Sequence, residues 1–124
     1  MFPSKGSKYG ATKVSLDGFS FASKLEASVY AQLKLMEKVG QLKILQCQDH
    51  IFLTDARIEY IPDFKCLDLK TTDVYWVEAK GYESPTWPIK KRLWKHFGPG
   101  RLQIWKGTYL RPAIAEEIIP KRLA

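Results

Sequence analysis

Cysteine is scarce in this chain of 124 residues, which contains only Cys47 and Cys66. The two cysteines form no Cys-x-x-Cys pair, so the sequence supports neither a disulfide scaffold nor a zinc site of that kind. We therefore expect both side chains to be reduced thiols in the core.

Long hydrophobic runs and an acidic excess are also missing. No apolar run is long enough to span a bilayer, and residues 1–13 are basic and rich in glycine and serine, without the hydrophobic stretch of a signal peptide. We therefore expect a cytoplasmic protein that does not bind membranes. Twenty Lys and Arg against thirteen Asp and Glu give a net charge of +7, which favours an anionic partner such as nucleic acid.

The chain has the length of one domain and shows no internal repeat. Residues 1–13 lack hydrophobic periodicity, and we interpret them as a flexible basic arm that orders on DNA. The arm contributes three candidate DNA-binding residues, Lys5, Lys8 and Lys13. Residues 14–124 then form the single domain.

Hydrophobic patterns predict an α/β fold, with a central mixed or antiparallel sheet flanked by helices. Residues 14–21 alternate around the turn dipeptide Asp17-Gly18 and predict a short hairpin. A helix is expected over residues 23–39, which begin with Ser23 and are followed by Gly40. Short apolar segments predict strands at residues 42–47, 51–53 and 57–61.

A second helix is expected over residues 89–97, after a loop, with Ile89, Leu93 and Phe97 facing the core. Trp94 would either pack inside or offer a stacking surface. The other faces are basic and suit phosphate contacts, although a solvated helix with ordinary charges is the alternative. The candidate DNA-binding residues here are Lys90, Lys91, Arg92 and Lys95.

The end of the chain has a weaker pattern. Residues 102–105 predict a last strand. Residues 111–124 contain isoleucines at spacings that fit a short helix broken at Pro120, packed on the core or on another subunit.

The sequence Ile-Pro-Asp-Phe at residues 61–64 and the apolar run that ends in Glu78-Ala79-Lys80 predict a metal site. Side chains alternate along a strand, so Glu78 and Lys80 share one face. Antiparallel pairing through a turn near residues 68–73 would place Asp63 beside Glu78. Two carboxylates of this kind suit Mg²⁺. The alternative is a solvent-facing strand edge that carries an ordinary ion pair.

Glu26 has two interpretations that are both physically sound. Ser23 and Glu26 match a capping box, in which the glutamate stabilises the start of the helix. In the other interpretation, the Glu26 carboxylate points to Asp63 and Glu78 and helps to hold a cation or its water.

Taken together, the motifs resemble those of PD-(D/E)xK nucleases, in particular the small phage-associated members. The resemblance covers about residues 8–97 and consists of four weak motifs in the family's order. They are Lys8-Tyr9-Gly10, Ser23-Lys24-Leu25-Glu26-Ala27, Pro62-Asp63-Phe64 and Glu78-Ala79-Lys80-Gly81, with Leu42 and Gln48 between the second and the third. The family often has Gln-Pro where this chain has Gln48-Asp49, which leaves a substrate-positioning role for Gln48 open.

The resemblance implies a restriction-endonuclease-like core and hydrolysis of DNA by metal-activated water. It implies that Mg²⁺, or Mn²⁺ in its place, is held by Glu26, Asp63, Glu78 and the Ala79 carbonyl. Lys80 would orient the attacking hydroxide or stabilise the phosphate, so the implied catalytic residues are Glu26, Asp63, Glu78 and Lys80.

Archaeal-type Holliday junction resolvases are of similar size and motif order. They suggest a homodimer that cuts four-way junctions in recombination or in phage DNA processing, which would place the protein in the bacterial host cytoplasm if a phage encodes it. The small chain favours recognition of DNA shape and backbone over base sequence. Two alternatives stay open: a general or nicking endonuclease like a transposase subunit, and a basic DNA-binding module without catalysis.

Overall fold

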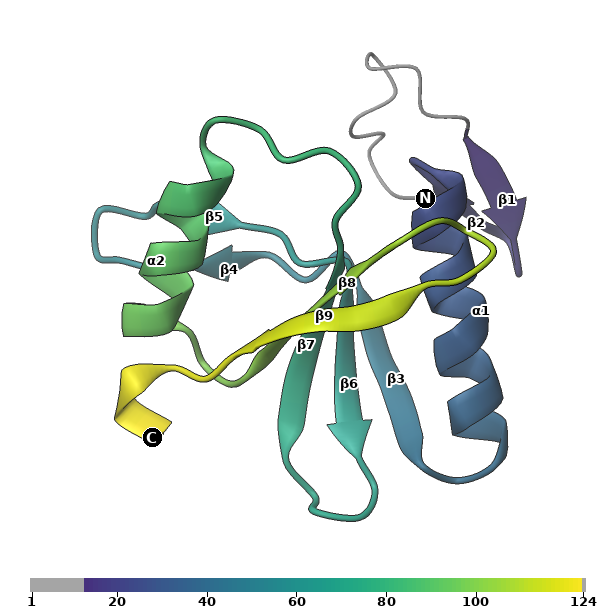
Figure 1. Cartoon of the computed structure of the whole chain (residues 1–124). Coiled ribbons are helices and arrows are strands. Elements are labelled where there is room, and N and C mark those ends of the chain that lie inside the picture. Colours follow the sequence, from purple (N-terminus) through teal and green to yellow (C-terminus); the bar gives the residue numbers. More distant parts are fainter. Residues whose placement is uncertain (1–12, 124) are drawn as a thin grey trace.

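The computed structural model describes residues 13–123 and has a five-stranded sheet at its centre (Figure 1). The strand order is β3-β6-β7-β8-β9. Their bounds are β3 (Leu42–Cys47), β6 (Phe64–Asp68), β7 (Val74–Ala79), β8 (Leu102–Lys106) and β9 (Ala113–Ile118). Neighbours are antiparallel except β7 and β8, which are parallel. The predicted α/β class and mixed sheet are confirmed.

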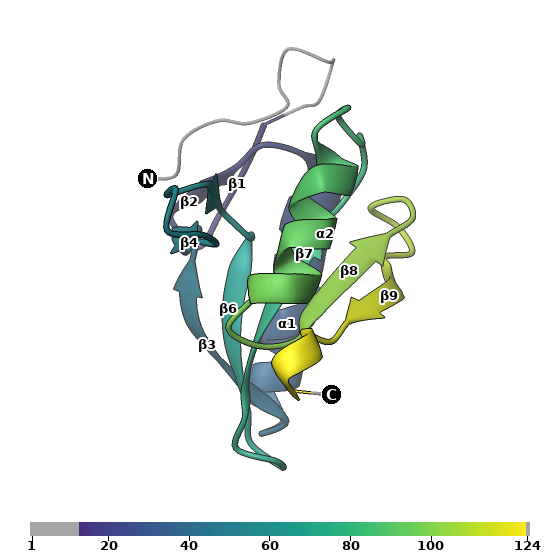
Figure 2. The same cartoon turned by 90° about the vertical axis from the view of Figure 1, so that its left-hand side faces the viewer.

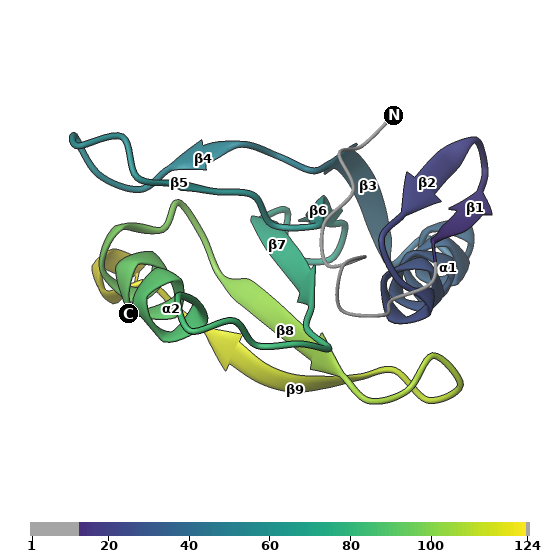
Figure 3. The same cartoon turned by 90° about the horizontal axis from the view of Figure 1, so that it is seen from above.

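Two helices, α1 (Lys24–Lys38) and α2 (Trp87–Phe97), lie on opposite faces of this sheet (Figures 2 and 3). The α1 face buries Phe64 and Val77, and the α2 face buries Trp76 and Ile104. This division follows from the alternation of side chains along β6, β7 and β8. Each face of the sheet therefore has its own apolar cluster.

The first helix begins as predicted. Ser23 is the N-cap, and its hydroxyl oxygen accepts a hydrogen bond from the Glu26 backbone N–H at 3.1 Å. The helix is followed by Gly40, whose φ of +82° is the left-handed conformation that glycine adopts without steric cost. A cap and a stop signal thus set both ends of α1.

Two small hairpins complete the β structure. Strands β1 (Val14–Leu16) and β2 (Phe19–Phe21) pair across Asp17 and Gly18, which have φ angles of 53° and 80°. Positive φ at both central residues is the geometry that two-residue hairpins favour, so the predicted hairpin is confirmed. Strands β4 (Ile51–Phe52) and β5 (Glu59–Tyr60) form the second hairpin, shorter than the predicted strands.

The buried face of α2 differs from the predicted one. Ile89 and Phe97 are 55% and 54% exposed, whereas Trp87 and Trp94 are buried. The Trp94 ring lies 5.5 Å from that of Trp76, and its indole N–H donates to a backbone carbonyl. Tryptophan buries more apolar area than isoleucine or phenylalanine, so the two tryptophans decide which face turns inward.

The end of the chain also differs from the prediction. The segment predicted as a helix contains strand β9, which pairs antiparallel with β8, and the short 3-10 helix Lys121–Leu123. Strand β8 is therefore not the last. Pairing with β9 satisfies the backbone groups along the outer side of β8, which a helix could not do.

Both cysteines are free thiols, as expected: Cys66 is buried and Cys47 is half-buried. Between residues 13 and 123, no helix is both long and apolar enough to cross a membrane.

Candidate functional site

The predicted motifs meet at one end of the sheet, where β6 begins and β7 ends (Figure 1). The two strands are antiparallel with Phe64 opposite Val77. The same register continued by one residue puts Asp63 opposite Glu78, as the sequence predicted. Helix α1 begins and β3 ends at this same end of the molecule.

Asp63 is held against the end of β7. Its side chain is 0% exposed, and Oδ2 accepts a hydrogen bond from the Ala79 backbone N–H at 2.8 Å. Its backbone carbonyl accepts from the Gln48 N–H at 2.9 Å. The carboxylate is therefore fixed by the strand that also carries Glu78.

Glu78 is 2% exposed and bonds to two side chains. Its Oε1 accepts from the Tyr60 hydroxyl at 2.8 Å, and its Oε2 lies 3.3 Å from Lys80 Nζ. Burial raises the pKa of Tyr60, and the charges of Glu78 and Asp63 raise it further. The Tyr60 hydroxyl thus keeps its proton and donates to the carboxylate.

Lys80 lies on the same face of the strand as Glu78, as the alternation predicted. Its Nζ is 4.1 Å from the centroid of the Trp87 ring, at the first turn of α2. A cation over an indole face is attracted by the ring electrons. The ammonium is therefore held between the Glu78 carboxylate and the start of α2.

Glu26 lies in the first turn of α1, and its backbone N–H and its side chain have different partners. Its backbone N–H is capped by Ser23, while its side chain is 4% exposed and its Oε1 lies 3.3 Å from Gln48 Nε2, which donates to it. Burial raises the pKa of Cys47 to about 11, and the charges of Glu26 and Asp63 raise it in the same direction. Gln48 connects the two acidic residues, because its side-chain amide donates to Glu26 and its backbone N–H donates to the Asp63 carbonyl.

The residues at this end have the donor chemistry that Mg²⁺ requires. Asp63 and Glu78 provide carboxylate oxygens, and the predicted carbonyl ligand, Ala79, ends β7 beside them. Within residues 13–123, no group of three or more His, Cys, Asp or Glu is arranged to hold a metal ion. Mg²⁺ usually takes one or two carboxylates and completes its shell with water and substrate phosphate, so the pair fits this ion.

Tyr60 and Trp87 were not predicted as site residues. Tyr60 comes from β5, outside the central sheet, and Trp87 comes from α2. Tyr60 had one weak signal, its position in the same apolar segment as the Pro-Asp motif. Trp87 fell within the segment predicted as a loop, where no periodicity would place it near Lys80, whereas α2 begins at this residue.

The candidate DNA-binding residues differ in exposure and in their partners. Lys13, Arg92 and Lys95 are exposed, whereas Lys90 and Lys91 are half-buried. Lys90 donates to the Glu59 carbonyl, and Lys91 lies 2.7 Å from Glu116. Lys5 and Lys8 lie outside the described residues.

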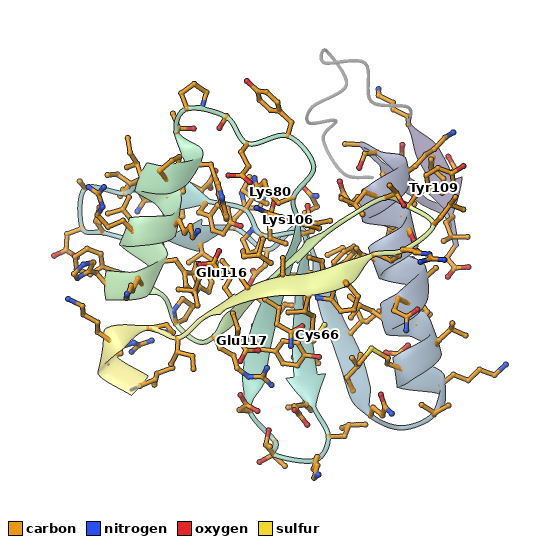
Figure 4. The ribbon with its side chains drawn as sticks, viewed as in Figure 1. Cys66, Lys80, Lys106, Tyr109, Glu116 and Glu117 are labelled. Atoms are coloured by element: carbon orange, nitrogen blue, oxygen red, sulfur yellow. The ribbon has the colours of Figure 1, made fainter. Side chains whose placement is uncertain are left out.

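The basic side of α2 borders a groove of about 490 Å³ that faces β9. Its charged lining residues are Lys91, Arg92, Lys95, Glu116 and Glu117. Glu116 and Glu117 come from β9 (Figure 4), two strands across the sheet from β7, which carries Glu78. Asp63, Glu78 and Lys80 are not among the residues that line this groove, and its acidic wall offsets part of the helix charge.

One family model matches residues 6–105, and it is described as "Protein of unknown function (DUF1064)". The match covers Glu26, Asp63, Glu78 and Lys80 and ends in β8. No curated protein and no solved structure matches the chain. Since the matched region is most of the chain, the protein belongs to the DUF1064 family of proteins of unknown function.

Proposed function

We propose that this protein is a metal-dependent DNA endonuclease of the PD-(D/E)xK type, with a restriction-endonuclease-like core. The observation that carries the proposal is the buried pair of Asp63 and Glu78, with Lys80 3.3 Å from Glu78. Burial disfavours ionised carboxylates, and a divalent cation between them offsets that cost. An ordinary solvent-facing ion pair would not need burial of both acids.

The proposed roles follow from the contacts of each residue. Asp63, Glu78 and the Ala79 carbonyl would hold Mg²⁺ or Mn²⁺, with Glu26 as a further carboxylate close by. Bound metal supplies water of lowered pKa and neutralises charge on the phosphate. The Tyr60 hydroxyl fixes the Glu78 carboxylate at Oε1, and Lys80 lies beside Oε2. The Lys80 ammonium stabilises negative charge on the scissile phosphate.

The proposed substrate is branched DNA, most specifically a four-way junction. The net charge of +7 favours a polyanion, and Arg92 and Lys95 are exposed on the helix that follows the site. A homodimer would place two sites on one junction and make two symmetric cuts. We place this activity in DNA recombination or phage DNA processing in the cytoplasm.

The test is cleavage of a labelled four-way junction and a matched linear duplex in Mg²⁺, Mn²⁺ or EDTA. Wild type is compared with Glu78→Ala and with Asp55→Ala, which removes an exposed acid from the β4–β5 hairpin. We expect paired symmetric nicks at the junction for wild type and Asp55→Ala, and none in EDTA or for Glu78→Ala. Equal cutting of duplex would indicate a general nuclease, and binding without cutting would indicate a DNA-binding module.

A further inference from the structure

A second lysine, Lys106, lies beside Lys80 at the candidate site. Strands β7 and β8 are parallel with Ala79 opposite Trp105, and the Lys80 N–H donates to the Trp105 carbonyl at 2.8 Å. Lys80 and Lys106 follow these paired residues. Side chains at paired positions project to the same face, so both ammonium groups lie on the face that carries Glu78 (Figure 4).

Lys106 is paired with an acid from the segment that joins β7 to α2. Its Nζ lies 2.6 Å from Glu83 Oε2, and the two side chains are 42% and 46% exposed. The hydrogen bond from Lys106 is the main cause of the lowered pKa of Glu83, and the charges of Lys106, Lys91 and Lys80 act in the same direction. The Glu83 carboxylate thus occupies a position at which three lysines attract negative charge.

We propose that Lys106 binds a DNA backbone phosphate next to the scissile one, and that Glu83 occupies the place of this phosphate in the free protein. The proposal rests on the DNA cleavage proposed above and extends it to a second phosphate. Exposed ion pairs contribute little to stability, so a phosphate can displace the Glu83 carboxylate readily. Lys106 is a binding residue in this account, and Glu83 acts only through Lys106.

Binding of a labelled four-way junction is measured in EDTA, which prevents metal-dependent cutting, between about 50 and 200 mM KCl. The binding constant K falls as salt rises, and loss of one phosphate contact makes the plot of log K against log salt less steep by about 0.9. We expect this change for Lys106→Gln. Lys106→Arg keeps the charge and should keep the slope. The matched control is Lys70→Gln, an exposed lysine in the turn between β6 and β7, at the opposite end of these strands.

Glu83→Gln tests the role of the acid. We expect it to tighten binding about 2- to 5-fold in the wild-type background, the size of an exposed ion pair, and to have no effect in the Lys106→Gln background. A slope for Lys106→Gln equal to that of Lys70→Gln would overturn the phosphate contact. Equal tightening by Glu83→Gln in both backgrounds would overturn the exchange.

Cleavage in Mg²⁺ is measured on the same set of proteins. If wild type binds but does not cut, the nuclease proposal fails while the salt slopes still decide the role of Lys106. If wild type cuts but the slope does not depend on Lys106, only the second phosphate contact fails.

Discussion

The two ends of the central sheet use charged residues in opposite ways. At one end, Arg101 lies within 3.0–3.2 Å of three carboxylates whose side chains are 25–46% exposed. These carboxylates belong to Asp68, Asp73 and Glu117. At the other end, Asp63 and Glu78 are 0% and 2% exposed, and Lys80 lies beside Glu78.

This difference shows that burial, more than residue type, separates a stabilising cluster from a candidate site. Around Arg101, water solvates the acids and the planar guanidinium reaches all three, so burial costs little. At the other end, burial of the Asp63 and Glu78 carboxylates carries a desolvation cost, which the Lys80 ammonium offsets in part and a bound metal ion would offset further. Asp63 precedes β6 and Asp68 ends it. Although both are aspartates, Asp63 is part of the buried candidate site and Asp68 is part of the exposed cluster around Arg101.

The largest expected effect is the loss of cleavage at the buried end. Asp63→Asn should lower the rate of Mg²⁺-dependent junction cleavage about 10³-fold, because it removes a metal ligand and its charge. Asp55→Asn serves as the matched control on an exposed hairpin. A rate for Asp63→Asn within tenfold of wild type would contradict the proposed site.

At the exposed end, Arg101→Gln should lower the free energy of unfolding by about 2 kcal/mol in urea denaturation. It removes three ion pairs and the contact of the guanidinium, 4.2 Å from the Tyr75 ring centroid. Arg101→Lys keeps the charge but loses the planar guanidinium. Its free energy of unfolding should therefore lie between those of wild type and Arg101→Gln. Cleavage measured well below the unfolding temperature should be unchanged, and a large loss of activity would mean that the two ends are not independent.

The sharpest contrast uses one substitution at the two ends of β6. In EDTA, Asp63→Asn should raise the free energy of unfolding by about 1 kcal/mol, since asparagine can still accept the Ala79 N–H and no longer places a second charge beside Glu78. Asp68→Asn should lower it by about 0.5 kcal/mol, since it breaks one pair with Arg101. Effects of the same sign would remove the distinction between the ends.

The smallest effect is a pH dependence at Asp73. Its hydrogen bond with Arg101 is the main cause of a pKa lowered from the ordinary 3.8. The folded state therefore binds this proton less readily than the unfolded state, and the stabilisation is present above about pH 4 and lost as the pH falls through the lowered pKa. The difference in urea midpoint between wild type and Asp73→Asn should thus shrink between pH 5 and about pH 2. A difference that does not change with pH would rule out this titration.

The parts that the sequence predicted depend on local patterns. Ser23 and Gly40 mark the two ends of α1, and Asp17-Gly18 marks the first hairpin. Asp63 and Glu78 could be paired because the turn between their strands is short, which leaves few possible registers.

The parts that were missed depend on contacts between distant residues. Ile114 and Ile118 have helical spacing, but β9 forms because β8 offers an unpaired edge. Ile89 and Phe97 fit an inward face, but Trp94 packs on Trp76 and takes that place. Tyr60 approaches Glu78 only once the β4–β5 hairpin lies beside the sheet.

The most direct test of the account is thermal and urea unfolding of wild type, Asp63→Asn and Asp68→Asn with and without Mg²⁺. At ten times its dissociation constant, Mg²⁺ should raise the free energy of unfolding by about 1.4 kcal/mol in wild type and in Asp68→Asn. Asp63→Asn should show no such increase. An equal increase in Asp63→Asn, or none in wild type, would contradict a metal site at the buried carboxylate pair.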